Sequence, residues 1–147
     1  MMIESVEFHN FKALRDAKLP LSRFTLIVGP NGSGKSTAMQ ALQEVGKPTN
    51  IDLIRIITAG IDPMSNPVSV TVNWGEPFVG VQTVKTWLVR GDRVTRNYQG
   101  QQAEPDTYNF LDEALAAIRI YSLDAESIAA PATASTSRGA RSLSPAP

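Results

Sequence analysis

The stretch Gly29-Pro30-Asn31-Gly32-Ser33-Gly34-Lys35-Ser36-Thr37 decides the fold, because its first eight residues match the pattern G-x-x-x-x-G-K-[ST] in full. Its glycines let the backbone take dihedral angles that other residues avoid, so that successive amide N–H groups can surround an anion. The pattern has its usual meaning only with a strand before it and a helix after it. We therefore expect strand, loop and helix in that order, with the loop binding phosphate groups.

Both flanks of this loop have the required pattern. Phe24 to Val28 is an almost continuous apolar run, which is typical of a central strand covered on both faces. From Lys35 onward the apolar residues recur at helical spacing, at Ala38, Ala41, Leu42 and Val45. Gly46 is expected to cap this helix in the left-handed conformation, and Pro48 prevents the helix from resuming.

Three side chains of the loop have expected roles in binding a nucleotide with Mg²⁺. Lys35 should reach the β and γ phosphates, and the Ser36 hydroxyl should ligate the Mg²⁺ that bridges them. Thr37 can add a hydrogen bond to the α phosphate. The helix N-terminus contributes free N–H groups and a partial positive charge. The other expected binding positions belong to the wrapping backbone: Gly29, Asn31, Gly32, Ser33 and Gly34.

The rest of the chain predicts strands with short links and one more helix. The strand candidates are Ile3 to Phe8, Ala17 to Leu21, Val68 to Trp74, Val79 to Arg90 and Val94 to Tyr98, the last two joined by a turn at Gly91-Asp92. Pro105 opens a helix with apolar positions at Phe110, Leu111, Ala114, Leu115 and Ile118. The apolar residues from Ile51 to Ile57 fit either a short helix or a strand. The expected fold class is α/β, with a mixed sheet of a central parallel strand before the loop and antiparallel strands.

Composition narrows the classes of function. Fourteen basic residues balance fourteen acidic ones, so the chain as a whole gives no electrostatic support for binding nucleic acid. The absence of cysteine excludes disulfides and thiolate metal sites, and His9 is the single histidine. There is no signal-peptide pattern and no apolar run long enough to span a membrane, so a cytoplasmic protein is expected.

A change in composition suggests a boundary near residue 126. Residues 1–125 have the composition of a folded segment, whereas residues 126–147 consist almost entirely of Ala, Ser, Thr, Pro, Gly and Arg. Such a tail buries too little apolar surface to offset the entropy lost on ordering, so we expect it to be disordered. Translation in a shifted reading frame is one hypothesis for its origin.

The loop resembles the GPNGSGKST form of the Walker A motif of AAA and ABC-type P-loop ATPases. The segment from Ile3 to Leu14, with its Asn10-Phe11-Lys12 turn, resembles the opening of ABC-type ATPases of the SMC, RecF and OLD-like kind. This resemblance implies ATP hydrolysis coupled to conformational change, in DNA repair, chromosome maintenance or phage defence. It also implies a second copy or a partner ATPase half as protein partner, and contact with nucleic acid within the family.

The resemblance carries over residue by residue to Gly29, Asn31, Gly32, Gly34, Lys35, Ser36 and Thr37, and it implies ATP as the nucleotide. Lys12 occupies a position where these proteins often place a basic residue near the nucleotide. Gln82 is the one candidate for a nucleotide-sensing glutamine, although an exposed strand residue is the simpler interpretation.

The sequence departs from the family pattern in ways that put hydrolysis in doubt. It contains no Leu-Ser-Gly-Gly-like signature and no run of four apolar residues ending in Asp-Glu. The nearest match, Asp112-Glu113, lies in an expected helix and is interpreted as a pair of surface carboxylates. No catalytic residue is assigned, and the chain resembles the N-terminal half of an ATPase head. The alternatives are a stand-alone nucleotide-binding module without turnover and, less favoured, a small P-loop kinase.

Two groups of residues have simpler interpretations. Trp74 and Trp87 lie in strand patterns and are expected to pack in the sheet rather than to stack on bases. The charged residues around the expected hairpin turn are interpreted as a solvated rim, with contact to a DNA backbone as the alternative: Arg90, Asp92, Arg93 and Arg96.

Overall fold

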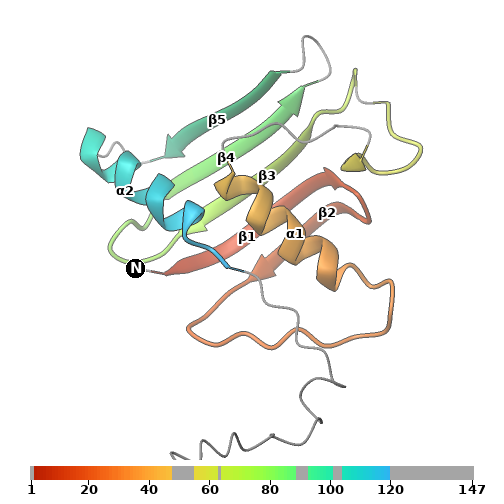
Figure 1. Cartoon of the computed structure of the whole chain (residues 1–147), viewed down its shortest axis with the longest axis horizontal. Helices are drawn as coiled ribbons and strands as arrows, with labels where there is room; N and C mark the ends of the chain where they lie inside the picture. Colours follow the sequence, from red (N-terminus) through yellow and green to blue (C-terminus); the bar gives the residue numbers. More distant parts are fainter. Residues whose placement is uncertain (1, 48–54, 63, 89–92, 101–103, 120–147) are drawn as a thin grey trace, which may run out of the picture.

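The computed structural model describes residues 2–47, 55–62, 64–88, 93–100 and 104–119. These residues form an antiparallel sheet of five strands in the order β2-β1-β3-β4-β5. The strands are β1 (Ile3–Phe11), β2 (Leu14–Pro20), β3 (Val68–Trp74), β4 (Val81–Leu88) and β5 (Arg93–Gly100). Helices α1 (Lys35–Gly46) and α2 (Pro105–Ala116) lie side by side over one face of the sheet (Figure 1).

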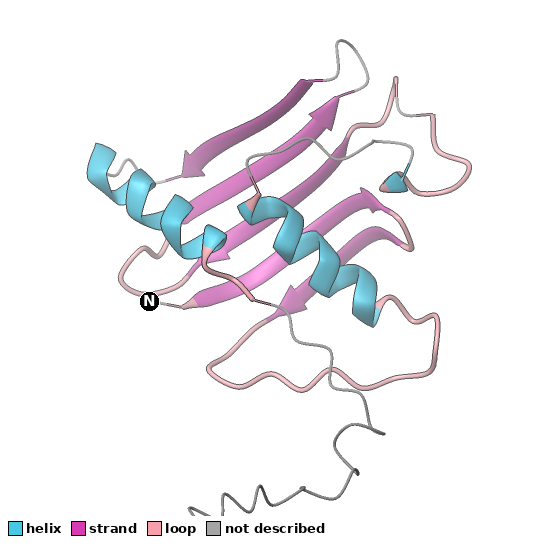
Figure 2. Cartoon of the chain, viewed as in Figure 1, coloured by secondary structure: helices cyan, strands magenta, loops and turns pink. Residues whose placement is uncertain are grey.

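Alternating sequence gives the sheet one apolar and one polar face. In β3, Val68, Val70, Val72 and Trp74 are buried while the residues between them are only partly buried. Successive strand side chains point to opposite faces, so these four residues share the face that the helices cover. The sheet and its two helices therefore form a two-layer structure with the core between the layers (Figure 2).

Both tryptophans are buried, which confirms that they pack within the fold. Trp74 and Trp87 are 1% and 2% exposed. The ring of Trp87 lies 6.0 Å from that of Phe11, centroid to centroid, and the indole N–H of Trp74 donates to Thr83 Oγ1 at 2.8 Å. On the helical side, α2 contributes Leu111 and Leu115 to the same core.

The strand expected from Phe24 to Val28 is not part of the sheet, so that prediction is wrong for the described chain. The segment runs as an irregular connection between β2 and α1, drawn as a loop in Figure 2. Phe24, Leu26 and Val28 are 82%, 73% and 78% exposed. A strand needs a neighbour for its backbone hydrogen bonds, and no described strand lies beside this segment. The parallel component of the expected mixed sheet is therefore missing, although strands and helices pack as an α/β structure.

Gly46 does not cap α1 in the left-handed conformation, which corrects the second expectation about this region. It is the last residue of α1 and is not among the glycines with positive φ. Its role is to allow close packing, because a Cβ atom at Gly46 would lie 2.2 Å from the carbonyl oxygen of Leu115. The absence of a side chain lets the end of α1 approach the end of α2.

Several expectations lie outside the described residues. They are the Gly91-Asp92 turn, most of the ambiguous segment after Thr49, and the tail from 126 to 147. At the described end of the ambiguous segment, Ile56 is fully buried and Ile57 forms an isolated β-bridge with Phe11.

Candidate functional site

The glycine-rich loop leads directly into the N-terminus of α1. Gly34 is the N-cap with φ 89°, and Gly32 has φ 82°, both in the left-handed region that favours glycine. No side chain caps this helix end, and its first turn contains no acidic residue. The first N–H groups of the helix and their partial positive charge therefore remain open to an anion.

The side chain of Lys35 folds back over the loop. Its Nζ donates to the carbonyl oxygens of Gly29 and Pro30, each at 2.7 Å, and lies 3.4 Å from Ser33 Oγ. Ser36 is exposed, and Thr37 is partly exposed, in the first turn of the helix. The Lys35 ammonium group is thus held within the loop, and the Ser36 side chain is exposed in the adjoining first turn of α1.

A cavity of about 330 Å³ adjoins the loop. Its walls include Phe8, Leu14 and Leu19 from the first two strands, and Ile27 and Gly34 from the loop segment. A Cβ atom at Gly34 would come within 2.9 Å of Leu14 Cδ2, so β2 packs directly against the loop. Among the described residues that line this cavity, none is acidic.

Lys12 does not line the loop cavity. Its backbone has φ 51°, and its Nζ donates to Gln40 Oε1 on α1 at 2.7 Å. Lys12 is therefore bonded to the middle of the helix rather than to the loop.

Gln82 lies on β4 and donates to Asn73 Oδ1 at 2.7 Å, away from the loop, as expected for an ordinary strand residue.

Asp112 and Glu113 lie on α2, as the sequence predicts. Asp112 Oδ1 accepts hydrogen bonds from Arg96 Nη1 and, at 2.5 Å, from the hydroxyl of Tyr98. Burial first, and then this bond to Asp112, raises the pKa of Tyr98 above its usual range. Arg96 is therefore not part of a solvated rim, because its side chain points toward the helices and joins β5 to α2.

Sequence reasoning missed Lys85, which is 2% exposed and lies beneath α1. Its Nζ donates to the carbonyl oxygens of Glu44 at 2.6 Å and of Lys47 at 2.7 Å. The alternation of β4 contained the signal, because Lys85 has the same parity as the buried Val81 and Trp87. A lysine at an inward position of a strand requires bonding partners in the core.

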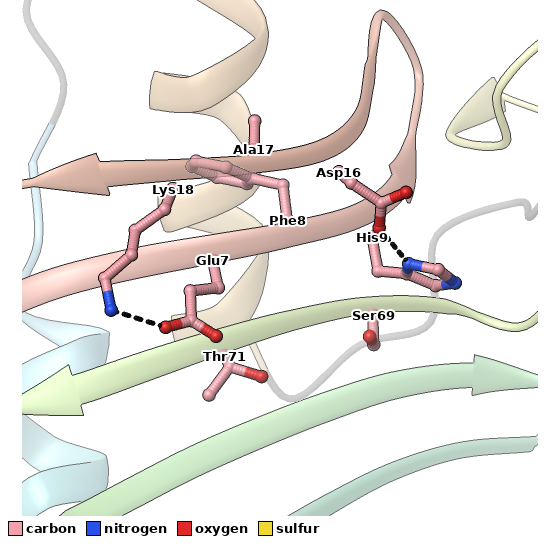
Figure 3. A pocket seen from close by; sticks show the side chains of 8 residues that line it. All are labelled: Glu7, Phe8, His9, Asp16, Ala17, Lys18, Ser69 and Thr71. Carbon is pink, nitrogen blue, oxygen red and sulfur yellow. Dashed lines mark hydrogen bonds and ion pairs between the residues drawn. The ribbon is translucent and has the colours of Figure 1, made fainter.

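A second hollow, of about 450 Å³, lies on the polar face of the sheet (Figure 3). Lys18 Nζ lies 2.8 Å from Glu7 Oε1, and His9 Nδ1 lies 2.6 Å from Asp16 Oδ1. The hydrogen bond from Lys18 is the main cause that holds the pKa of Glu7 below its usual value. These side chains bond to one another across β1 and β2, so the hollow offers less to a ligand than the loop does.

No described helix is long and apolar enough to cross a membrane. The described residues also contain no group of three or more His, Cys, Asp or Glu side chains placed to hold a metal ion.

Residues 1–85 match a protein family described as the AAA ATPase domain. Structural maintenance of chromosomes protein 1B of Mus musculus is 38% identical over 99 residues, which cover 60% of this chain and 8% of that protein. The OLD nuclease of Thermus scotoductus is 46% identical over 44 residues, which cover 30% of this chain and 8% of the nuclease. The chain thus spans less than a tenth of the length of these relatives.

Solved structures support the same fold. The SMC head domain from Thermotoga maritima matches with a TM-score of 0.55 and 23% identity, over 76% of this chain and 42% of that one. The recombination mediator protein RecF with ATP matches with a TM-score of 0.55 and 16% identity, over 71% and 29% of the two chains. These structural matches confirm the α/β fold class. Together with the matches in sequence, they confirm the predicted resemblance to SMC, RecF and OLD proteins.

Proposed function

The chain belongs to the AAA ATPase domain family, and we propose that it binds Mg·ATP through the loop from Gly29 to Thr37. The observation that carries this proposal is the open N-terminus of α1, with left-handed Gly32 and Gly34 before it and no capping side chain. Backbone N–H groups and the helix dipole together favour a phosphate at such an end.

The polar side chains around the loop match the chemistry of a triphosphate. The ammonium group of Lys35 is bonded to the loop's own oxygen atoms, and phosphate oxygens, which are charged, are stronger acceptors for it. Ser36 is exposed beside Lys35, and its hydroxyl fits Mg²⁺, which takes few protein oxygens and fills its other positions with phosphate and water. When bound, Mg²⁺ would neutralise charge on the phosphates. Thr37 and the backbone amide of Asn31 supply further donors.

We propose binding without turnover for this chain alone. Hydrolysis needs a group that orients or deprotonates water, and no carboxylate lines the cavity within the described residues. A partner ATPase half would have to supply that group. The kinase alternative is less favoured, because the described strands are all antiparallel and form no further parallel strand–helix units.

The exposed segment from Phe24 to Val28 supports a protein partner. Phe24, Leu26 and Val28 alternate along the chain and are all exposed, which is the pattern of a strand without its neighbours. We propose that a second copy or a partner ATPase half pairs with this segment and turns it into the strand that the sequence predicts. Relatives named for chromosome maintenance and as an OLD nuclease support a role in DNA maintenance for the resulting assembly. Phage defence is the alternative role that the family resemblance implies.

Binding of a fluorescent ATP analogue with and without Mg²⁺ tests the nucleotide site. We expect Lys35→Ala to weaken binding by about 100-fold or more, because a charged donor to the phosphates is lost. Arg119→Ala is the control, because it removes one positive charge from an exposed residue beyond the end of α2 and should leave affinity within about twofold. Equal affinity of wild type and Lys35→Ala would contradict the proposal.

Sedimentation velocity tests the proposed partner segment. Leu26→Lys places a charge on the exposed apolar row, so we expect it to abolish self-association of the chain or its binding to a co-expressed ATPase half. Arg15→Lys keeps the charge of an exposed residue and serves as the control. Unchanged association in Leu26→Lys would exclude this segment from the interface.

A further inference from the structure

Helix α1 is held at the end opposite the loop by a buried cation. Lys85, on β4, donates from one ammonium group to the carbonyl oxygens of Glu44 and Lys47, which are 2.6 and 2.7 Å away. These carbonyls belong to the last turn of the helix and its C-cap, where carbonyl oxygens keep spare acceptor capacity and the dipole is negative. The Glu44 carbonyl also accepts the backbone N–H of Lys47, at 3.3 Å. A cation fits both features of this helix end.

A second cation continues the connection from α1 to β5 and α2. Arg96 Nη2 lies 3.3 Å from the same Lys47 carbonyl, and Arg96 Nη1 donates to Asp112 on α2. Lys85 also lies over the ring of Trp87, 5.2 Å from its centroid. The C-terminal end of α1 is therefore joined to β4, β5 and α2 through a few charged groups.

The two ends of α1 belong to one rigid element. The helix contains 12 residues, so its ends are about 18 Å apart at 1.5 Å per residue. Apart from the hydrogen bond between Lys12 and Gln40 near its middle, α1 packs on the core through apolar side chains, which permit sliding more readily than directed hydrogen bonds do. These side chains are Ala38, Ala41, Leu42 and Val45. A change of angle at the C-terminal end would displace the loop at the other end.

We propose that Lys85 is a positioning residue for the nucleotide site, which anchors the C-terminal end of α1 to β4 and so fixes where the loop presents its N–H groups. This inference rests on the proposed function. Lys85 touches neither the loop nor its cavity. The ammonium group acts through the helix, and the affinity for Mg·ATP depends on the bonds it makes.

Lys85→Met tests the anchor, because methionine preserves most of the apolar stem and removes both hydrogen bonds. Two quantities are measured near neutral pH: the affinity for a fluorescent ATP analogue with Mg²⁺, and hydrogen exchange of the last turn of α1 without nucleotide. We expect about threefold to thirtyfold weaker binding, the range typical of coupling through a packed network. We also expect faster exchange in the last turn.

Thr83→Val is the matched control for a loss of stability alone. Thr83 is fully buried on the same strand and face, and it accepts a hydrogen bond from Trp74. Its replacement should lower the melting temperature without altering nucleotide affinity or exchange in α1. Lys85→Arg, which keeps donors for both carbonyls, should restore affinity to within about threefold of wild type.

The outcomes separate the anchor from the nucleotide site. Equal affinity and equal exchange in wild type and Lys85→Met would overturn the anchor, as would a loss of affinity in Thr83→Val as large as that in Lys85→Met. If the wild type binds no nucleotide, the proposed function fails, and exchange in the nucleotide-free chain still decides whether Lys85 holds α1. If Lys85→Met does not fold, Lys85→Gln, which can donate to one carbonyl, is measured in the same way.

Discussion

The two ends of α1 have opposite properties. At the N-terminal end, the glycine-rich loop is exposed, the helix is uncapped, and the Lys35 ammonium is bonded to loop oxygens. At the C-terminal end, Gly46 is packed against the backbone of α2, and Lys85 binds the last carbonyls. One end is open to a ligand and the other is fixed to the fold. The difference shows that a flexible loop can present a defined binding geometry when the helix behind it is held.

The largest effect is expected at the fixed end. Gly46→Ala would place a Cβ atom 2.2 Å from the Leu115 carbonyl oxygen, which forces α1 and α2 apart. We expect a loss of about 3 kcal/mol or more in the free energy of unfolding, measured by chemical denaturation. Gly75→Ala is the control, because its nearest contact would be an ordinary 3.4 Å. Similar stability of both variants would show that the helices can separate at little cost.

At the open end, Gly34→Ala should affect binding more than folding. Gly34 has φ 89°, and an added Cβ would meet the movable end of Leu14. We expect a stability loss of about 1 to 2 kcal/mol from the left-handed conformation, and about tenfold weaker nucleotide binding as the loop shifts. Gly60→Ala has comparable strain in open space at φ 79°. It should lose similar stability and keep its affinity, so a matching loss of affinity would refute this explanation.

The fixed end should also have a pH dependence. Burial first, and then Arg96, lower the pKa of Lys85 to about 8 from 10.5. Glu44 opposes this shift and Lys47 adds to it. The unfolded chain therefore binds more protons between these two values, and stability rises with pH across that window.

Denaturation at about pH 7 and about pH 9.5 measures this effect. We expect Lys85 to contribute an increase of about 1 to 2 kcal/mol over that range, and Lys85→Met to lack it. The range ends below pH 10 because the pKa of Tyr98 is raised in the folded chain. Above the ordinary tyrosine pKa of 10.0, the unfolded chain loses this proton while the folded chain keeps it, so stability falls as pH rises. The same pH dependence in both proteins would mean that Lys85 does not titrate in the folded state below its ordinary pKa.

The smallest effect is expected where α2 joins β5. Asp112→Asn removes the charge that accepts from Arg96 and Tyr98, and we expect a loss of about 1 kcal/mol. The Tyr98 pKa should fall toward its ordinary value, which the ultraviolet absorbance of tyrosinate measures. An unchanged tyrosine titration would show that burial alone raises that pKa. Glu113→Gln, on the same helix, is the control.

The sequence predicted correctly those elements whose pattern depends only on residues close together in the chain. The alternation of β3 and the helical spacing after Lys35 correspond to observed elements. The strand at Phe24 was not predicted correctly. An apolar run indicates that a segment tends to pair as a strand, but it does not show whether a neighbouring strand is present to pair with it. The role of Gly46 depends on Leu115, far along the chain, so its sequence context suggested an ordinary cap.

The candidate site was easier to predict than its support. Lys35 and Ser36 follow from a motif in which every position is contiguous. The bonds of Lys85 and Arg96 depend on which strand faces which helix end, and the pattern assigned Arg96 to a solvated rim. Strand parity could have placed Lys85 inside, but only the packed structure gives it partners.

The exposed segment between β2 and α1 has a consequence for how the chain holds together when it is cut. Extended backbone without ladder hydrogen bonds is what a protease binds, so cleavage should begin near Leu26. The hairpin of β1 and β2 would then be a separate fragment, but β1 lies between β2 and β3 and pairs with both. The two fragments would remain joined through the sheet, and the chain is therefore a natural starting point for a split protein that reassembles from its pieces.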